Sequence, residues 1–266
     1  MKKTFLFLFF LPLFNSCTED VSREINTELT REAEQFFQFT EVLSETNYLG
    51  NISYQDYFRL NSKDLPGCPT LIRSLNSRII QLDYSNPVDC EKENKNLRSG
   101  KISVDFSLST STNPSWTLTF EDYSFDGIKI QGSKRFKTLS TTENQEFFEN
   151  LQVELSGNLG YSASGTLTHG IERDNFKPFR LSTRGKIEGK NPVGREFNLV
   201  INASKTQLFS CLDKGWILPQ SGSESWIVSR GSGGSLDYKV SFQSGLECNP
   251  VVIATLPDGR SLQLNP

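Results

Sequence analysis

The stretch WTLTFEDYSFDGIKIQG, residues 116–132, decides the fold. Apolar and polar side chains alternate from Trp116 to Glu121, and an apolar residue recurs at every second position after Gly127. Because successive side chains of a β-strand point to opposite faces, this period predicts strands with one buried and one solvated face. Asp126-Gly127 supplies the positive φ angles of a two-residue type I′ turn. The stretch therefore predicts an antiparallel β-hairpin.

The same two-residue period recurs along the chain towards its C-terminus, and a second Asp-Gly pair, Asp258-Gly259, predicts another two-residue hairpin turn. Regular solvated faces favour antiparallel over parallel pairing, because parallel sheets are covered on both sides. Roughly ten to fourteen strands are expected. The predicted class is all-β, with antiparallel strands in either an extended sandwich or an open or curled sheet. The segments with this period include 102–108, 151–155, 159–163, 197–201 and 236–242.

One N-terminal segment has a helical period instead. From Ser22 to about Glu45, apolar residues recur at steps of three and four, and polar residues fill the opposite face. This pattern predicts a single amphipathic helix. Its polar face is rich in glutamate, which anionic lipid would repel, so packing on the β domain or spacing it from a membrane is favoured over lying on a bilayer.

The first seventeen residues have the organisation of an export signal. Met1-Lys2-Lys3 is positively charged, residues 5–14 are almost entirely apolar, and a small residue, Ser16, precedes Cys17. A charged start, a short apolar run and a small-residue cleavage site are typical of a secretory signal peptide. The apolar run is too short for a membrane-spanning helix, which needs about 20 residues.

The stretch Leu13-Phe14-Asn15-Ser16-Cys17 resembles a lipobox, in which the cysteine thiol receives a diacylglycerol before cleavage. Phe14 and Asn15 depart from the strict pattern, and looser boxes of this kind are similar to those of Bacteroidetes lipoproteins. Glu19-Asp20 resembles the acidic signal that sends some of those proteins to the cell surface. We therefore expect a lipid anchor (palmitate-type acyl chains) on Cys17 in the outer membrane, facing either the cell surface or the periplasm.

The expected organisation is a signal peptide over residues 1–16, a lipidated tether and helix over 17–48, and a β domain over 49–266. Removing residues 1–16 deletes two lysines and no acid, which moves the formal charge from −3 to −5. A chain without a basic surplus is a poor partner for nucleic acid, because it cannot neutralise phosphates.

The four remaining cysteines predict two disulfides in an oxidising compartment. Sequence proximity favours Cys68–Cys90 and Cys211–Cys248, each worth about 3–4 kcal/mol in the chain-entropy model. Zinc is disfavoured, since the cysteines lack CxxC spacing and no histidine stands near them. Neither a metal nor another cofactor is expected.

A short Leu-Asp-Tyr repeat lies between the cysteines of each pair. Leu82-Asp83-Tyr84 stands between the first pair and Leu236-Asp237-Tyr238 between the second, which predicts two related halves. The order of these features, with Arg98-Ser99-Gly100-Lys101 and Asp126-Gly127-Ile128, resembles a family of Bacteroidetes lipoproteins of unknown function. The resemblance implies a long antiparallel β architecture and no catalytic residues.

Candidate chemical groups are few. His169 is the single histidine, and its Thr-His-Gly setting predicts a surface position. Glu121, Asp122 and Asp126 gather near the first hairpin turn, where paired carboxylates could serve glycan binding or cleavage. Trp216 is expected to be more exposed than Trp116 and Trp226, which lie within alternating strands and are expected in the core.

These observations favour a non-enzymatic lipoprotein that binds an envelope partner or has a structural role. A glycan-binding or glycan-cleaving module is the first alternative, and the ligand-binding residues expected for it are Trp216, Glu121, Asp122 and Asp126. A carrier for an apolar ligand, with the sheet curled around lipid, is the second alternative.

Overall fold

The computed structural model describes residues 18–89, 97–174, 177–212, 214–231 and 233–265. Within them, thirteen strands form one sheet in which every strand pairs with its sequence neighbours. All pairings are antiparallel, as the alternation predicts. The sequence left a sandwich and an open or curled sheet as alternatives, and the structure has a single open, curled sheet.

The strands are β1 (Thr70–Ser74), β2 (Ile79–Asp83), β3 (Arg98–Asp105), β4 (Ser115–Phe125), β5 (Ile128–Ser140), β6 (Glu143–Leu155), β7 (Leu159–Asp174), β8 (Lys177–Lys190), β9 (Glu196–Leu208), β10 (Ser221–Ser229), β11 (Ser235–Gln243), β12 (Val251–Thr255) and β13 (Ser261–Gln263). The helices are α1 (Thr18–Gly50), α2 (Tyr54–Arg59) and α3 (Phe209–Leu212), with short 3₁₀ turns at Ser62–Asp64 and Leu246–Cys248.

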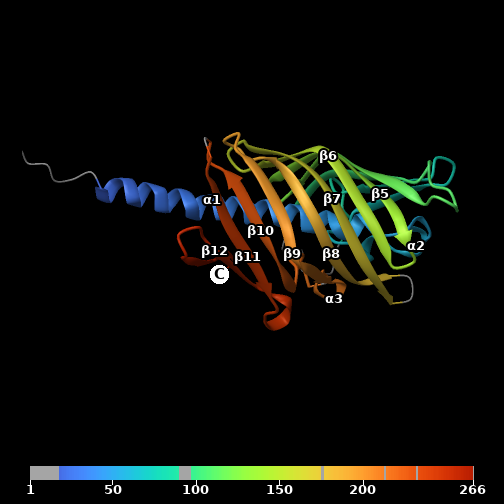
Figure 1. Cartoon of the computed structure of the whole chain (residues 1–266). Helices are drawn as coiled ribbons and strands as arrows, with labels where there is room; N and C mark the ends of the chain where they lie inside the picture. Colours follow the sequence, from blue (N-terminus) through green and yellow to red (C-terminus); the bar gives the residue numbers. More distant parts are fainter. Residues whose placement is uncertain (1–17, 90–96, 175–176, 213, 232, 266) are drawn as a thin grey trace, which may run out of the picture.

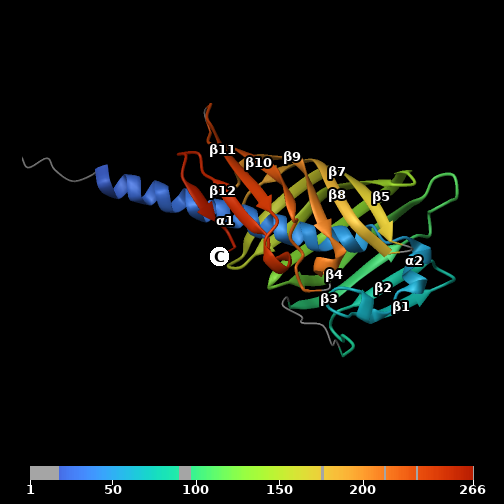
Figure 2. The same ribbon diagram turned by 90° about the horizontal axis from the view of Figure 1, so that it is seen from below.

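The sheet curls around α1, which crosses its concave side while the strands pass the helix diagonally (Figures 1 and 2). Because the strands alternate in direction, their connections fall on two rims. The near rim holds the β4–β5, β6–β7, β8–β9 and β10–β11 turns, and the far rim holds the β1–β2, β3–β4, β5–β6 and β7–β8 turns. Helix α1 begins beyond the near rim and ends at the far rim, beside α2 (Figure 1).

Helix α1 fills the space that the sheet encloses. Phe36 stacks on Trp226 with ring centroids 4.3 Å apart, and Phe39 contacts Tyr161 and Trp226 at 5.0 and 5.4 Å. At the far rim the Trp116 indole N–H donates to the Gly50 carbonyl at 2.8 Å. Burial of each such aromatic side chain contributes about 1.5–3 kcal/mol. The buried apolar residues of the helix and of the sheet form one continuous core.

Helix α1 is longer than predicted, and the polar face of its second half is buried instead of solvated. From Phe39 to Ile52 every residue except Glu41 is buried, whereas Arg31, Glu34 and Gln38 stay exposed. The predicted packing of the helix on the β domain is confirmed, and the solvated polar face was wrong for its second half. The curled sheet reaches around the helix and covers that face.

The two Asp-Gly pairs form different turns. Asp126 and Gly127 both have positive φ, 48° and 79°, between paired Phe125 and Ile128, so the predicted two-residue turn is confirmed. The second turn is one residue longer, because the Leu256 N–H donates to the Arg260 carbonyl at 2.8 Å and only Gly259 has positive φ. Pro257 explains this difference, since its fixed φ suits the first central position of a type I turn.

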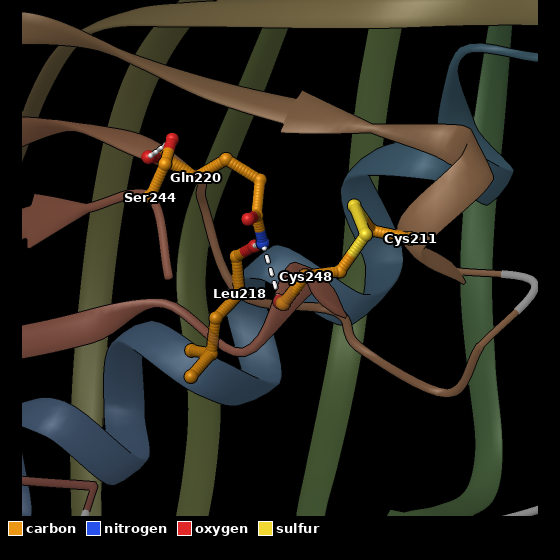
Figure 3. The surroundings of a disulfide bond; sticks show 5 residues. All are labelled: Cys211, Leu218, Gln220, Ser244 and Cys248. Atoms are coloured by element: carbon orange, nitrogen blue, oxygen red, sulfur yellow. Dashed lines mark hydrogen bonds between the residues drawn. A yellow bond between two sulfur atoms is a disulfide. The ribbon is translucent and has the colours of Figure 1, made fainter. Parts of the chain in front are cut away.

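The predicted Cys211–Cys248 disulfide is present, with its Cα atoms 5.4 Å apart. Around it, the Gln220 side-chain amide donates to the Cys248 carbonyl at 2.9 Å, and Ser244 donates to the Gln220 carbonyl at 2.8 Å (Figure 3). The bridge ties the β9–β10 and β11–β12 connections together.

The second pairing stays a prediction, because Cys90 lies outside the described residues. The Val88 N–H donates to the Cys68 carbonyl at 3.0 Å, which returns the chain to Cys68 two residues before Cys90. The expected signal peptide and Cys17 also lie outside the described residues. Among the described helices, none is both long and apolar enough to cross a membrane.

Candidate functional site

The three predicted ligand-binding acids lie towards the near-rim end of β4 and in the β4–β5 turn. Glu121 is exposed and accepts from the Ser103 hydroxyl at 2.8 Å, while Asp122 occupies a bulge at φ 51°. The Asp126 carboxylate accepts from the Leu97 N–H at 2.6 Å. These contacts give Glu121 a solvated strand position and Asp126 a backbone-capping role.

The predicted tryptophan positions are as expected, but they do not join the acids. Trp116 and Trp226 are buried, and Trp216 is half-buried in the β9–β10 connection. That connection falls on the same side of the meander as the far-rim turns, whereas Asp126 lies in a near-rim turn. Alternation of strand direction therefore separates Trp216 from the acids, and the four predicted ligand residues form no common site.

The surface position predicted for His169 is wrong. His169 lies in the middle of β7 and is fully buried. Its Nε2 lies 2.9 Å from Glu146 Oε2, and its Nδ1 lies 3.0 Å from Thr183 Oγ1. The Thr-His-Gly sequence continues a strand here, and the inward position places the imidazole among polar partners instead of in solvent.

His169 belongs to a row of polar side chains that crosses the inner face of the sheet, one from each of six neighbouring strands. We call this row the inner polar belt; it consists of Lys134, Glu146, His169, Thr183, Lys205 and Glu224. Each lies at an inward position and is at least nine-tenths buried. Buried polar groups need partners, because an unpaired one costs a desolvation penalty of about 1–3 kcal/mol.

Helix α1 supplies partners at both ends of the belt. Lys134 Nζ donates to Thr46 Oγ1 at 2.7 Å and forms an ion pair with Glu146 Oε1 at 3.0 Å. At the other end Lys205 pairs with Glu224 at 2.6 Å, and the Thr40 hydroxyl donates to Glu224 at the same distance. Within each pair the charge of the lysine offsets the charge of the glutamate.

Burial alone would raise the pKa of Glu146, but the charge of Lys134 and the hydrogen bond to His169 outweigh it and lower that pKa to about 2. The carboxylate is therefore ionised at neutral pH, although it is fully buried. The inner polar belt is sealed from solvent by α1, so it has the chemistry of a structural network and no route for a substrate.

Two glutamates of α1 repeat one motif on either side of the belt. Glu45 accepts from Arg98 at 2.5 and 3.0 Å and from the Tyr123 hydroxyl at 3.2 Å. Glu32 accepts in the same way from Arg230 and the Tyr238 hydroxyl. Each glutamate thus meets an arginine and a tyrosine of the sheet, which fixes the position of the helix along its axis.

A cavity open to solvent lies at the far rim, with a volume of about 300 Å³. We call it the far-rim pocket. Its walls come from the α1–α2 connection, the β1–β2, β3–β4 and β5–β6 turns, and the far end of β7. Its lining includes Tyr54, Arg78, Trp116, Asn144 and Arg173.

Two shallow hollows lie on strands β6–β9, with volumes of about 480 and 460 Å³. They share Ser164, Glu188 and Asn198, which are outward strand positions. Their lining is a mixture of hydroxyl, amide and oppositely charged groups. We assign them no ligand.

Within the described residues, no group of three or more His, Cys, Asp or Glu side chains is placed to hold a metal ion. No known protein-family model matches the chain, and neither a curated protein nor a solved structure does.

Sequence reasoning missed the far-rim pocket. Its lining residues come from five separate segments, and each looks like an ordinary turn or strand end in the sequence. Trp116 was the one signal available, and it was interpreted correctly as a core residue. The pocket exists because the end of α1 meets three turns of the sheet.

The buried Lys134–Glu146 pair generates the first prediction. Lys134→Met should destabilise the fold by about 3–5 kcal/mol, because it leaves a buried carboxylate without its cation. The double variant Lys134→Met/Glu146→Gln should recover part of that loss. Urea unfolding followed by circular dichroism measures both.

Lys129→Met is the matched control, since the exposed Lys129–Glu154 pair at 3.4 Å is worth less than about 1 kcal/mol. If Lys134→Met lowered the unfolding free energy no more than Lys129→Met does, the inner polar belt would not be a sealed network.

The half-buried Glu41 of α1 generates a second prediction. Burial, with the nearby negative charges of Asp126 and Glu45, raises its pKa to about 7. A raised carboxyl pKa means that folding favours the protonated form. The stability contributed by this group is therefore fully present below its ordinary pKa of 4.5 and is lost as the pH rises to about 7.

Glu41→Gln should consequently match the parent protein at pH 4.5 and exceed its unfolding free energy at pH 8 by about 1–3 kcal/mol. Urea titrations at both pH values measure this difference. Glu34→Gln, an exposed position of the same helix, is the control and should change neither value. Equal gains for both variants at both pH values would contradict the assignment.

Proposed function

We propose that this chain is a bacterial envelope lipoprotein, anchored in the outer membrane by lipid on Cys17, with a non-enzymatic binding or structural role. Its β domain acts as a rigid module held at the membrane surface. An envelope protein or a glycan is the expected partner, and nucleic acid is not. The cell surface and the periplasmic face are both open as locations.

The observation that carries this proposal is the continuity between the expected anchor and the core. Helix α1 starts at Thr18, directly after the expected lipidated cysteine, and continues without interruption to Gly50 inside the sheet. At about 1.5 Å per residue, its first ten residues span about 15 Å before the helix enters the sheet. The lipid would thus be attached to the folded core through a helix and not through a loose linker.

The far rim has features that suit a partner. Single exposed apolar side chains are normal on a protein surface, but several at one end are typical of an interaction site. Helix α2, beside this rim, lies at the opposite end of the molecule from the start of α1 (Figure 1). Large apolar residues exposed on this side of the sheet, in or beside its turns, include Phe58, Leu75, Leu108, Leu139, Phe179 and Leu246.

The filled interior argues against a carrier for an apolar ligand. Phe36, Phe39 and Leu49 of α1 are fully buried against the sheet, in the space that such a ligand would need. The inner polar belt is sealed, and the hydrogen bonds of Glu121 and Asp126 serve the strand and the turn; both observations favour binding over glycan cleavage. A glycan-binding role stays open, and the far-rim pocket is its best location.

Replacing Cys17 with serine should leave the precursor without lipid and uncleaved, because acylation needs the thiol and precedes cleavage; mass spectrometry measures both. Thr18→Ser is the matched control and should be lipidated and cleaved. Detection of an unmodified Cys17 thiol in membrane-bound protein by mass spectrometry would contradict the anchor.

Intact wild-type cells and a variant with alanine at Glu19 and Asp20 test the location. Protease added to intact cells should digest a surface-displayed protein, and alanine at both Glu19 and Asp20 should reduce the digestion. Full protection of the wild-type protein would place it on the periplasmic face.

A further inference from the structure

The far-rim pocket has a charge that the rest of the chain does not predict. Its lining includes two arginines and, among the described residues, no aspartate or glutamate, although the protein as a whole has a net charge of −3. At about 300 Å³ it lies at the lower end of the range for small-molecule sites. It therefore suits a ligand of about one sugar ring that carries negative charge.

We propose that the far-rim pocket binds a small sugar acid, a hydroxyl-rich ring with one carboxylate, and that Arg78 recognises the carboxylate. The assignment goes beyond the proposed envelope role and does not depend on the lipid anchor, because every group it uses lies in the described β domain or at the end of α1.

The two arginines are not equivalent. Arg173 pairs with Asp56 at 3.0 Å, so its charge is compensated within the protein. Arg78 donates to the Ser109 carbonyl at 2.8 Å and packs over the Tyr54 ring at 5.1 Å from its centroid, and the described structure gives it no carboxylate partner. A guanidinium has five N–H donors, so Arg78 can hold a ligand carboxylate in addition to Ser109. One uncompensated cation fits a ligand with one negative charge.

Hydroxyl groups line the same pocket. Thr138 and Ser140 come from the end of β5, Thr141 from the β5–β6 turn and Ser53 from the α1–α2 connection. Such groups both donate and accept hydrogen bonds, which matches the hydroxyls of a sugar and does not match an apolar molecule.

The polar lining is held rigidly, which favours binding. Asn144 donates to Asn51 Oδ1 at 3.0 Å, and Asn51 in turn donates to the Asn47 carbonyl at 2.8 Å. Below them Trp116 stacks on Phe106 and Phe136 with centroids 5.7 and 5.6 Å away. A preformed pocket avoids the ordering cost that a loose loop would add.

The test titrates sodium glucuronate, glucose and glucose 6-phosphate into the protein and follows the indole N–H signals by NMR. The chain has three tryptophans, and Trp116→Phe assigns the signal from the pocket. Glucuronate should shift the Trp116 signal and bind at least ~10-fold more tightly than glucose, because a charge-assisted hydrogen bond is worth at least that factor. Arg78→Gln should remove the same factor, and Arg78→Lys should remove part of it.

Arg184→Gln, an exposed arginine of β8 that pairs with Glu143 at 2.9 Å, is the control and should leave glucuronate binding unchanged. Equal melting temperatures for the arginine variants show that they fold. The proposal is overturned if glucuronate leaves the Trp116 signal in place, if folded Arg78→Gln binds it as tightly as the wild type, or if glucose 6-phosphate binds more tightly than glucuronate.

Discussion

The structure depends on one constraint: a thirteen-stranded sheet with a single concave side must fill that side, and α1 is the element that fills it. An uncovered sheet of this length would leave its inner apolar residues in water and its curvature undefined. The aromatic contacts of Phe36 and Phe39 supply the apolar part of the filling. Because the strands form a meander with short connections, the sheet can wrap the helix while its first and last strands stay unpaired with each other.

Covering a helix on nearly all sides creates a second requirement, since an amphipathic helix then buries its polar face as well. The inner polar belt and the arginine–tyrosine partners of Glu32 and Glu45 meet this requirement. Such networks add little net stability over an apolar core, but each member is costly to leave unpaired. They consequently favour one axial position and one rotation of the helix, which in turn place Asn51 and the α1–α2 connection at the far-rim pocket.

Local patterns predicted much of this fold and little of its interior. Alternation identified the antiparallel strands, Asp126-Gly127 identified its turn, and cysteine spacing identified Cys211–Cys248. The inner belt was invisible because an inward lysine or histidine, such as Lys134 or His169, looks like a solvated strand position in the sequence. Only the curvature of the sheet decides which face the helix covers. The far-rim pocket was missed for a related reason, since it is a junction of separate turns and has no sequence pattern of its own.

The central claim is that α1 is an integral part of the core and not a detachable tether. Amide hydrogen exchange of the intact mature protein tests it most directly, with peptides from residues 33–49 compared with peptides from β4 to β10. We predict that these helix amides exchange as slowly as those of the central strands, because they can open only when the sheet opens. Fast exchange of residues 33–49 beside a protected sheet would contradict it.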